Sequence, residues 1–431
     1  MKNLVYWIWL SLAVTPGSET FRKLIETFSD PKSIFDADGD AIARCIGSSS
    51  RDFDSLNCKD TERAEQILQF CEKKNVGILT YSDEAFPTSL YEINNPPVLL
   101  YYRGILPDFN KICMISMVGT RRLTDYGRRN AFVIGHDLAK AGAAIVSGMA
   151  IGIDGVSHAG AISAGGVNIA FLGSGIDVCY PEQHQKLARE IVKNGCVMTE
   201  YAPGTRPEGR NFPVRNRLIA GISCATVVIE GRERSGALIT ARCAKKYGKT
   251  VYALPGNVDN KTSEVTNLLI KNGAKLITAP DDIIRDLEFV YIGIINPFNL
   301  GQKLEVRMSD VLVQLGIACV AQSDDIFSTF PSKRKKRIEG NEEAEDAPSG
   351  IDTAQTETEA AQVAESSLEN LGFDKDTLNI YQRIPAGEDC SIEALVSGEY
   401  PLPKVMKALL KLEMGHFVVM LPGEMVRRKL K

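Results

Sequence analysis

Glycine-rich turns that also carry serine and arginine are the residues of this chain best suited to chemistry. Gly119-Thr120-Arg121-Arg122 follows one apolar run, Ser147-Gly148 to Gly152-Ile153-Asp154 follows the next, and Gly173-Ser174-Gly175 follows a third. Free backbone N–H groups at such turns bind phosphate, and the planar fork of arginine suits successive phosphate oxygens. The three turns predict an edge that holds phosphate groups. Alternatively, Arg121 pairs with Asp125 or Asp154 and braces its loop.

Two later segments add to this prediction. Phe212-Pro-Val-Arg215-Asn216-Arg217 starts a helix after a loop rich in proline, glycine and arginine. Arginines at a helix N-terminus oppose the helix dipole, which favours a role in holding an anion. Phe212 would either stack on a base or belong to the core. Ser235-Gly236 opens a further helix and would either offer N–H groups to phosphate or cap that helix.

Catalytic and metal sites find little support. Asp154 and His158 stand four residues apart on one helix face, yet no second cluster completes a site, and Asp154 suits a turn or cap. The ten cysteines form no C-x-x-C pair and only four histidines are present, so neither a zinc site nor a disulfide framework is indicated. We therefore expect no metal, no cofactor, no enzymatic activity and a reducing cytoplasm.

The elements that must position these turns form an α/β pattern. Short apolar runs are typical of buried parallel strands, and helical patterns separate them. The expected strands lie at 113–118, 143–146, 167–172, Val197–Thr199, Ala225–Ile229, Thr250–Leu254 and Lys275–Ile277, with helices at Glu182–Lys193, Ser235–Tyr247 and Ser263–Asn272. This alternation predicts an α/β domain with a doubly wound, mostly parallel sheet. Ligands bind such a sheet at the carboxyl edge.

The residues before this sheet divide into two parts. Residues 1–75 predict a small helical domain of the sterile-alpha-motif or helix-hairpin-helix type, or a plain docking domain. We expect Leu4–Val14 to be a core helix rather than a signal peptide. Within 76–290 a connector precedes the α/β domain, and its Val98–Tyr102 segment predicts a strand at the sheet's edge.

The residues after the sheet change in composition. Residues 291–373 combine an ambiguous segment, with a helix expected at Met308–Gly316, and a tract too poor in large apolar residues to fold. KRKKR at 333–337 is either a solvated linker charge or a weak contact to nucleic acid. Residues 374–431 predict a basic winged helix that contacts DNA or protein.

Global properties exclude two classes of partner. The formal net charge of −4 gives no overall attraction to nucleic acid, so any basic surface is local. No apolar run is long enough to span a bilayer, so we expect no membrane contact.

Taken together, the motifs closely resemble the DNA-processing protein A family, also called the DprA/Smf family. The matching segments are Val118-Gly-Thr-Arg121, Ser147 to Asp154, His158, Gly173-Ser-Gly175, Tyr180-Pro181, Phe212-Pro-x-Arg-Asn-Arg217, Ile219-Ala-Gly221, Ser235-Gly-x-Leu-Ile-Thr240-Ala241, Pro255-Gly256 and Leu269-Ile-x-x-Gly273-Ala274. They span about 113–285 in one order. Ile151 stands where members usually have arginine, so that phosphate contact is missing or supplied by Arg122.

The resemblance implies a cytoplasmic bacterial protein that binds single-stranded DNA and loads RecA recombinase onto it during natural transformation. It also implies that the α/β domain has an extended Rossmann-like fold and that the protein is a homodimer. The residues that it assigns to DNA are Arg121, the Ser147–Asp154 loop, Gly173–Gly175, Phe212, Arg215, Asn216 and Arg217. The alternatives are a Rossmann-like small-nucleotide-binding protein and a glycosidase acting on nucleoside monophosphates, although the P-G-G-x-G-T-x-x-E motif of those enzymes is absent.

Overall fold

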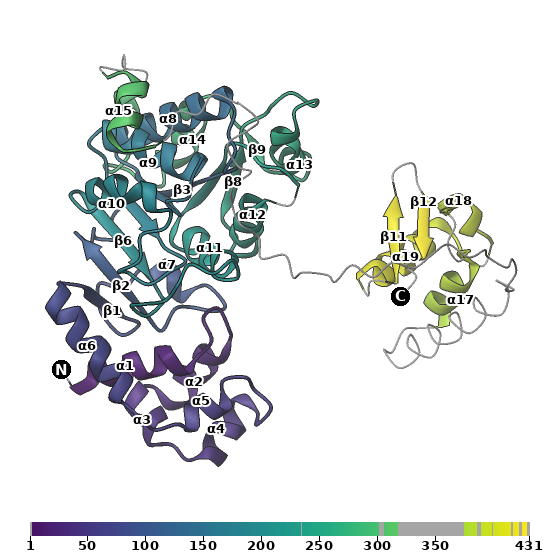
Figure 1. Cartoon of the computed structure of the whole chain (residues 1–431). Helices are drawn as coiled ribbons and strands as arrows, with labels where there is room; N and C mark the ends of the chain where they lie inside the picture. The colour runs from purple at the N-terminus through teal and green to yellow at the C-terminus, as the bar shows by residue number, and fades with distance from the viewer. Residues whose placement is uncertain are drawn as a thin grey trace, which may run out of the picture. The chain divides into compact units, whose positions relative to one another are not determined.

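The computed structural model describes residues 2–233, 235–300, 306–317, 375–385, 389–398, 400–414, 417–421 and 425–428. The chain divides into two compact units, the first ending at Thr329 and the second beginning at Phe330 (Figure 1). The KRKKR segment and the linker predicted after it lie outside the described residues.

Among the described residues, nine strands form one sheet in the order β1-β2-β6-β5-β4-β3-β7-β8-β9. The strands are β1 Gly77–Thr80, β2 Leu99–Gly104, β3 Met114–Val118, β4 Ala144–Ser147, β5 Asn168–Phe171, β6 Gly195–Thr199, β7 Ala225–Val228, β8 Thr250–Ala253 and β9 Lys275–Leu276. From β6 to β9 every neighbouring pair is parallel. The prediction of an α/β fold with a mostly parallel sheet is therefore confirmed.

The edge of the sheet differs from the expectation. The strand predicted near residues 98–102 is β2, and it pairs antiparallel with both β1 and β6. β2 is therefore the second strand of the sheet, because β1, which was not predicted, pairs with it and forms the edge. β1 was missed because it is only four residues long and lies in a segment rich in turn residues.

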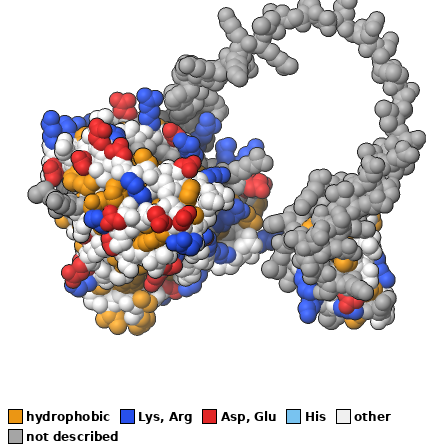
Figure 2. Space-filling view, turned by 90° about the horizontal axis from the view of Figure 1, so that it is seen from below, with side chains coloured by type: hydrophobic (Ala, Val, Ile, Leu, Met, Phe, Trp, Pro, Cys, Tyr) orange, Lys and Arg blue, Asp and Glu red, His pale blue; other side chains and the backbone are white. Residues whose placement is uncertain are grey.

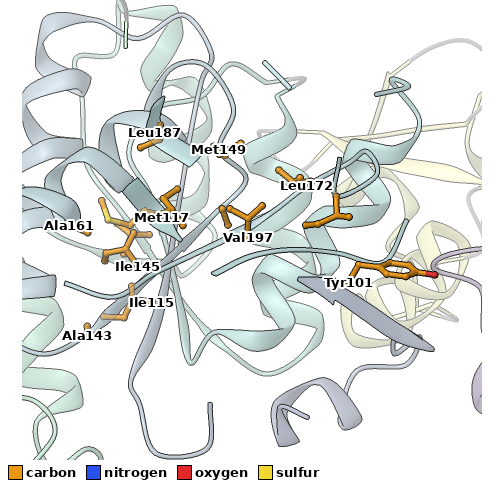
Figure 3. Close-up of a cluster of buried hydrophobic side chains, with 14 of the residues drawn as sticks. Tyr101, Ile115, Met117, Ala143, Ile145, Met149, Ala161, Leu172, Leu187 and Val197 are labelled. Atoms are coloured by element: carbon orange, nitrogen blue, oxygen red, sulfur yellow. The ribbon is translucent and has the colours of Figure 1, made fainter. Parts of the chain in front are cut away.

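Helices cover both faces of the sheet and bury its apolar side chains. One face carries α8 Asp125–Lys140, α9 Ile153–Ser163, α10 Gln185–Ile191, α14 Pro280–Leu287 and α15 Met308–Gln314, and the other α7 Thr88–Tyr91, α11 Asn211–Ile222, α12 Gly236–Lys246 and α13 Glu264–Lys271. Ile115, Ile145 and Val197 belong to the first of these cores (Figure 3). α8 and α9 can pack closely because Gly160 has no side chain. A Cβ at this position would stand 2.2 Å from the Phe132 carbonyl oxygen.

The N-terminal helices extend the first core rather than forming a separate one. They are α1 Lys2–Ala13, α2 Thr20–Phe28, α3 Pro31–Asp36, α4 Gly39–Ile46, α5 Phe53–Asn57 and α6 Glu62–Lys74. Trp7, Ile8 and Leu10 of α1 are buried in the same cluster as Tyr101 of β2. α1 is thus a core helix, as predicted, and the expected boundary at residue 75 falls inside a continuous core.

The second unit has its own small core. Its elements are α17 Lys375–Arg383, β10 Asp389–Ser391, α18 Ile392–Leu395, α19 Leu402–Met414, β11 Val418–Leu421 and β12 Met425–Arg428. The strands pair antiparallel in the order β10-β12-β11. Ile380, Val405 and Leu409 pack against Val418 and Val426.

The face shown in Figure 2 carries basic and acidic side chains interspersed. In the described parts of the chain, no helix is long and apolar enough to cross a membrane.

A candidate nucleic-acid interface at the carboxyl edge of the sheet

A cavity of about 540 Å³ lies where the strand order reverses, beside the carboxyl end of β3 between β4 and β7. Parallel sheets bind ligands at such a switch point because the loops on either side diverge there. The predicted site residues that line it are Gly119, Thr120, Arg121, Asp154, Phe212, Arg215, Asn216, Ser235 and Gly236. The fold thus brings together residues that are more than one hundred positions apart.

Phe212 is the centre of a stack of planar side chains at this cavity. The Arg121 guanidinium carbon lies 5.3 Å from the centre of its ring, and that of Arg215 lies 5.9 Å away. The Tyr180 ring is 5.5 Å from the Phe212 ring, with 39° between the planes. Arg121 and Tyr180 are exposed, so the stack continues to the surface. Planar groups in this arrangement offer both a cation and a stacking face to a base.

Gly173 is needed for this stack. A Cβ at Gly173 would stand only 2.8 Å from Cδ1 of Phe212, so the ring rests directly on the backbone of the loop after β5. The glycine therefore acts through packing, and no phosphate contact of its own is required.

Three helices begin at or beside the cavity without a side-chain cap. In the described part of the chain, no side chain accepts a hydrogen bond from the first turn of α9, α11 or α12. By contrast, α8 has a side-chain cap, since the Thr124 hydroxyl accepts a hydrogen bond from the Gly127 N–H at 3.1 Å. At α9 the Ile153 and Gly155 N–H groups donate to the Thr120 and Ala150 carbonyls, so it is at α11 and α12 that an uncapped N-terminus and its positive partial charge favour an anion nearby. Of the two alternatives for Ser235, a phosphate contact or a helix cap, the structure shows no side-chain cap.

Arg215 and Asp154 hold the loops of the cavity in place. Arg215 donates to the Gly148 carbonyl at 3.0 Å and to the Phe171 carbonyl, which fixes the ends of β4 and β5. Burial lowers the pKa of Arg215 to about 10, and the Asp154 carboxylate opposes that shift. Burial likewise raises the pKa of Asp154, which accepts the Gly148 N–H at 3.2 Å.

Arg121 is not held by the acidic partners considered from the sequence. Asp125 pairs instead with Arg128 at 2.7 Å, and the ion pairs of the described residues do not include Arg121. Arg122 is exposed on the same turn, and its N–H donates to the Thr120 hydroxyl at 3.2 Å. Gly152, at φ +91°, lets the loop after β4 touch this turn, since a Cβ there would stand 2.3 Å from the Thr120 carbonyl oxygen.

Eight predicted residues do not line the cavity. Four of them contact a residue that does, namely Arg122, Gly148, Gly152 and Gly173. The other four are Ser147, Ser174, Gly175 and Arg217. The Ser147 and Ser174 hydroxyls are buried and donate to the carbonyls of Met117 and Val178. The Gly175 N–H donates to the Thr205 carbonyl at 2.9 Å and is not free for a ligand.

Arg217 is the fourth, and its placement differs most from the expectation. It forms a two-pronged ion pair with Glu200, at 2.9 and 2.6 Å, with both side chains about 95% buried. Its acidic partner follows β6 and could not be identified from the local sequence. This geometry does not support the direct phosphate contact expected from its position near a helix N-terminus.

Comparison with known proteins assigns the chain to a family. The model of the family "DNA recombination-mediator protein A" matches residues 77–288. Protein Smf of Synechocystis is 34% identical over 309 residues, which cover 71% of this chain and 76% of that protein. The chain belongs to the DprA/Smf family. DNA processing protein DprA of Streptococcus pneumoniae is 39% identical over 207 residues, covering 48% of this chain and 73% of that protein.

The structure agrees with this DprA/Smf membership. The solved structure of DprA from Streptococcus pneumoniae superposes with a TM-score of 0.58 at 30% identity, covering 66% of this chain and 98% of that one. The Streptococcus pneumoniae relative is named a DNA processing protein, and the residues that line the cavity all lie within the segment that the family model matches.

Within this DprA/Smf fold, Asp154 lines the cavity and His158 does not. His158 is buried, and its Nδ1 lies 2.8 Å from Oδ1 of Asn168. Burial lowers the pKa of His158 to about 4, so the imidazole is neutral. No group of three metal-ligating side chains occurs among the described residues.

Sequence reasoning missed some residues of the cavity. Tyr180, Pro207, Gly209 and Ile239 also line it. For Tyr180, the Tyr180-Pro181 motif of the family resemblance is the sequence feature that could have indicated its place in the cavity.

Proposed function

We propose that this protein binds single-stranded DNA along the carboxyl edge of the sheet. The observation that carries the proposal is the exposed Arg121 guanidinium stacked on Phe212 at the mouth of the cavity. A single strand presents unpaired bases that stack on aromatic and guanidinium planes, and phosphates that pair with arginine. In duplex DNA the bases are paired and unavailable for such stacking. The arrangement therefore favours single strands.

The biological role that we propose is recombination mediation. In this role the protein holds incoming single-stranded DNA and loads RecA recombinase onto it during natural transformation, in the cytoplasm and as a homodimer. The support is the family membership and its description as a recombination mediator. We propose no enzymatic activity, because His158 is buried outside the cavity lining and Asp154 braces the loop of Gly148.

The second unit fits a winged helix. Its order of helix, strand, two helices and two strands is that of the motif, with α19 in the recognition-helix position. Lys407 and Lys411 of α19 are exposed beside the apolar Met406. We propose that this helix contacts either DNA backbone or protein. The N-terminal helices are proposed as a docking module.

A small nucleotide is the second candidate ligand. A volume of about 540 Å³ falls in the usual range of small-molecule pockets. The stack around Phe212 would bind the single base of a nucleotide as well as it would bind the successive bases of a DNA strand.

Binding experiments separate the two candidates. Fluorescence anisotropy with single-stranded and duplex oligonucleotides of equal length, across a salt series, should show tight and salt-dependent binding with a strong single-strand preference. In parallel, mononucleotides at micromolar concentration should leave the melting temperature unchanged. Stabilisation by mononucleotides together with weak oligonucleotide binding would support the small-nucleotide alternative.

A further inference from the structure

Two free thiols face one another at the amino ends of β3 and β7. The cavity lies at the opposite, carboxyl ends of these two strands. The sulfur atoms of Cys113 and Cys224 are 3.7 Å apart. Cys113 immediately precedes β3, and Cys224 immediately precedes β7. Neither residue belongs to the candidate DNA interface.

The backbone at this point already has a geometry that a disulfide requires. β3 and β7 are parallel neighbours, with Ile115 opposite Ala225, and the Cys224 N–H donates to the Met114 carbonyl at 2.9 Å. Residues one position out of register on adjacent strands have Cα atoms roughly 6 Å apart, within the disulfide range. Successive residues of a regular strand face opposite sides, but the 3.7 Å between the sulfurs shows that these two side chains turn toward each other at the strand ends. A bond between these sulfurs would therefore need side-chain rotation and little backbone movement.

The two thiols differ in access and in acidity. Cys113 is completely buried, whereas Cys224 is partly exposed. The hydrogen bond with Cys224, followed by burial, raises the pKa of Cys113. The hydrogen bond from Cys113 lowers the pKa of Cys224 against the effect of burial, and the Tyr291 hydroxyl and Lys249 add to that lowering. Cys224, the more accessible of the two, is thus the thiol that an oxidant reaches first.

We propose that Cys224 and Cys113 form a peroxide-responsive thiol pair. The Cys224 thiolate attacks hydrogen peroxide; its sulfur is oxidised to sulfenic acid as the O–O bond breaks and water leaves. The Cys113 sulfur then attacks the sulfenic sulfur, forms the S–S bond and releases a second water. Two thiols and one peroxide give one disulfide and two waters. A small-molecule dithiol reduces the disulfide back to two thiols by exchange and is itself oxidised to a disulfide.

The disulfide would join the two strands whose opposite ends carry the candidate site. Because β3 and β7 are already hydrogen-bonded, we expect the site to keep its shape. The crosslink closes a loop of 111 residues and so restricts the unfolded chain. We expect the melting temperature to rise by roughly 3–8 °C on oxidation.

Peptide mapping of the full-length chain tests the proposal. Trypsin releases Cys113 in peptide 112–121 and Cys224 in peptide 218–232, each with a single cysteine. After mild treatment of the folded, reduced chain with hydrogen peroxide, mass spectrometry should find these two peptides linked, and dithiothreitol should separate them. In Cys113→Ser the oxidised Cys224 should instead be captured by dimedone as a sulfenic acid.

Cys58 provides the matched control. It is exposed, and trypsin releases it in a third peptide, 52–59. Cys58→Ser should still form the 113–224 link and show the same rise in melting temperature. The proposal is overturned if the two peptides stay unlinked under conditions that oxidise Cys58, or if the link forms only in guanidinium. These results come from the wild-type chain and Cys58→Ser, so they stand even where Cys113→Ser does not fold.

Discussion

Arg215 and Arg217 stand two positions apart on α11, and both guanidinium groups are buried. Arg215 remains at the cavity and organises two strand ends through carbonyl contacts. Arg217 is paired with Glu200 away from it. At the scale of single residues, two arginines of one motif therefore have different roles. Arg215 shapes the candidate site, whereas Arg217 supports the fold.

Removing Arg217 should destabilise the protein rather than weaken a DNA contact. Arg217→Ala leaves the Glu200 carboxylate buried without its partner, which costs about 3–5 kcal/mol. Urea unfolding should show this loss, and the double variant Glu200→Gln with Arg217→Met should lose less than the sum of the two single changes. A loss below about 1 kcal/mol together with a shallower salt dependence of DNA binding would instead place Arg217 on the DNA.

His158 should make stability depend on pH. Its pKa is about 4 in the folded state and near 6.5 when unfolded, so between these values the unfolded chain binds an extra proton. Stability should therefore fall as pH drops from 6.5 towards 4, by on the order of 3 kcal/mol from this residue. Unfolding free energies of His158→Gln should decline less over that range than those of the wild type. Parallel curves for the two proteins would contradict this assignment.

At the scale of elements, loops pack against side chains through glycine. Gly173 lies under Phe212, and Gly148 lies under Arg215, where a Cβ would stand 2.4 Å from Nη2. The glycines at these two positions thus set where the aromatic ring and the buried cation lie. Their contribution to binding is indirect.

Gly173→Ala should disturb the stack without unfolding the protein. The new Cβ forces the Phe212 ring to move, and loss of part of one stacking contact should weaken single-strand binding about tenfold. Gly209→Ala is the matched control, because it also lines the cavity but its Cβ would meet nothing within 4 Å. Anisotropy measures both variants, and equal affinities would show that the ring position does not matter.

The sequence predicted the positions of the strands and of the site loops better than it predicted which way individual side chains point. Each predicted strand of the parallel sheet lies within about two residues of an observed one, because buried strands combine apolar runs with terminal glycines. β1, β10 and α14 were missed, being short or amphipathic within mixed segments. The inward direction of Arg217 depends on Glu200, a residue that only the fold brings near.

At the scale of the whole molecule, the chain consists of two units with separate cores. The candidate DNA interface lies entirely within the first unit. The net charge of −4 and the mixed surface charges leave local groups such as Arg121 to attract DNA. The second unit therefore should add little to single-strand affinity.

Deleting residues 374–431 tests this division. Single-strand affinity should stay within roughly threefold of the full chain, since the cavity, its helix N-termini and Arg121 are retained. Anisotropy at a fixed salt concentration gives the comparison. Near-complete loss of binding would move the principal DNA site to the second unit.

The salt dependence of single-strand binding by Arg121→Ala tests the central claim most directly. Loss of one phosphate contact should make the slope of log affinity against log salt shallower by roughly 0.7, for all sequences alike. Arg44→Ala, which removes an exposed arginine from α4, should leave the slope unchanged. A wild-type slope in Arg121→Ala would contradict the proposed site and place the DNA elsewhere on the molecule.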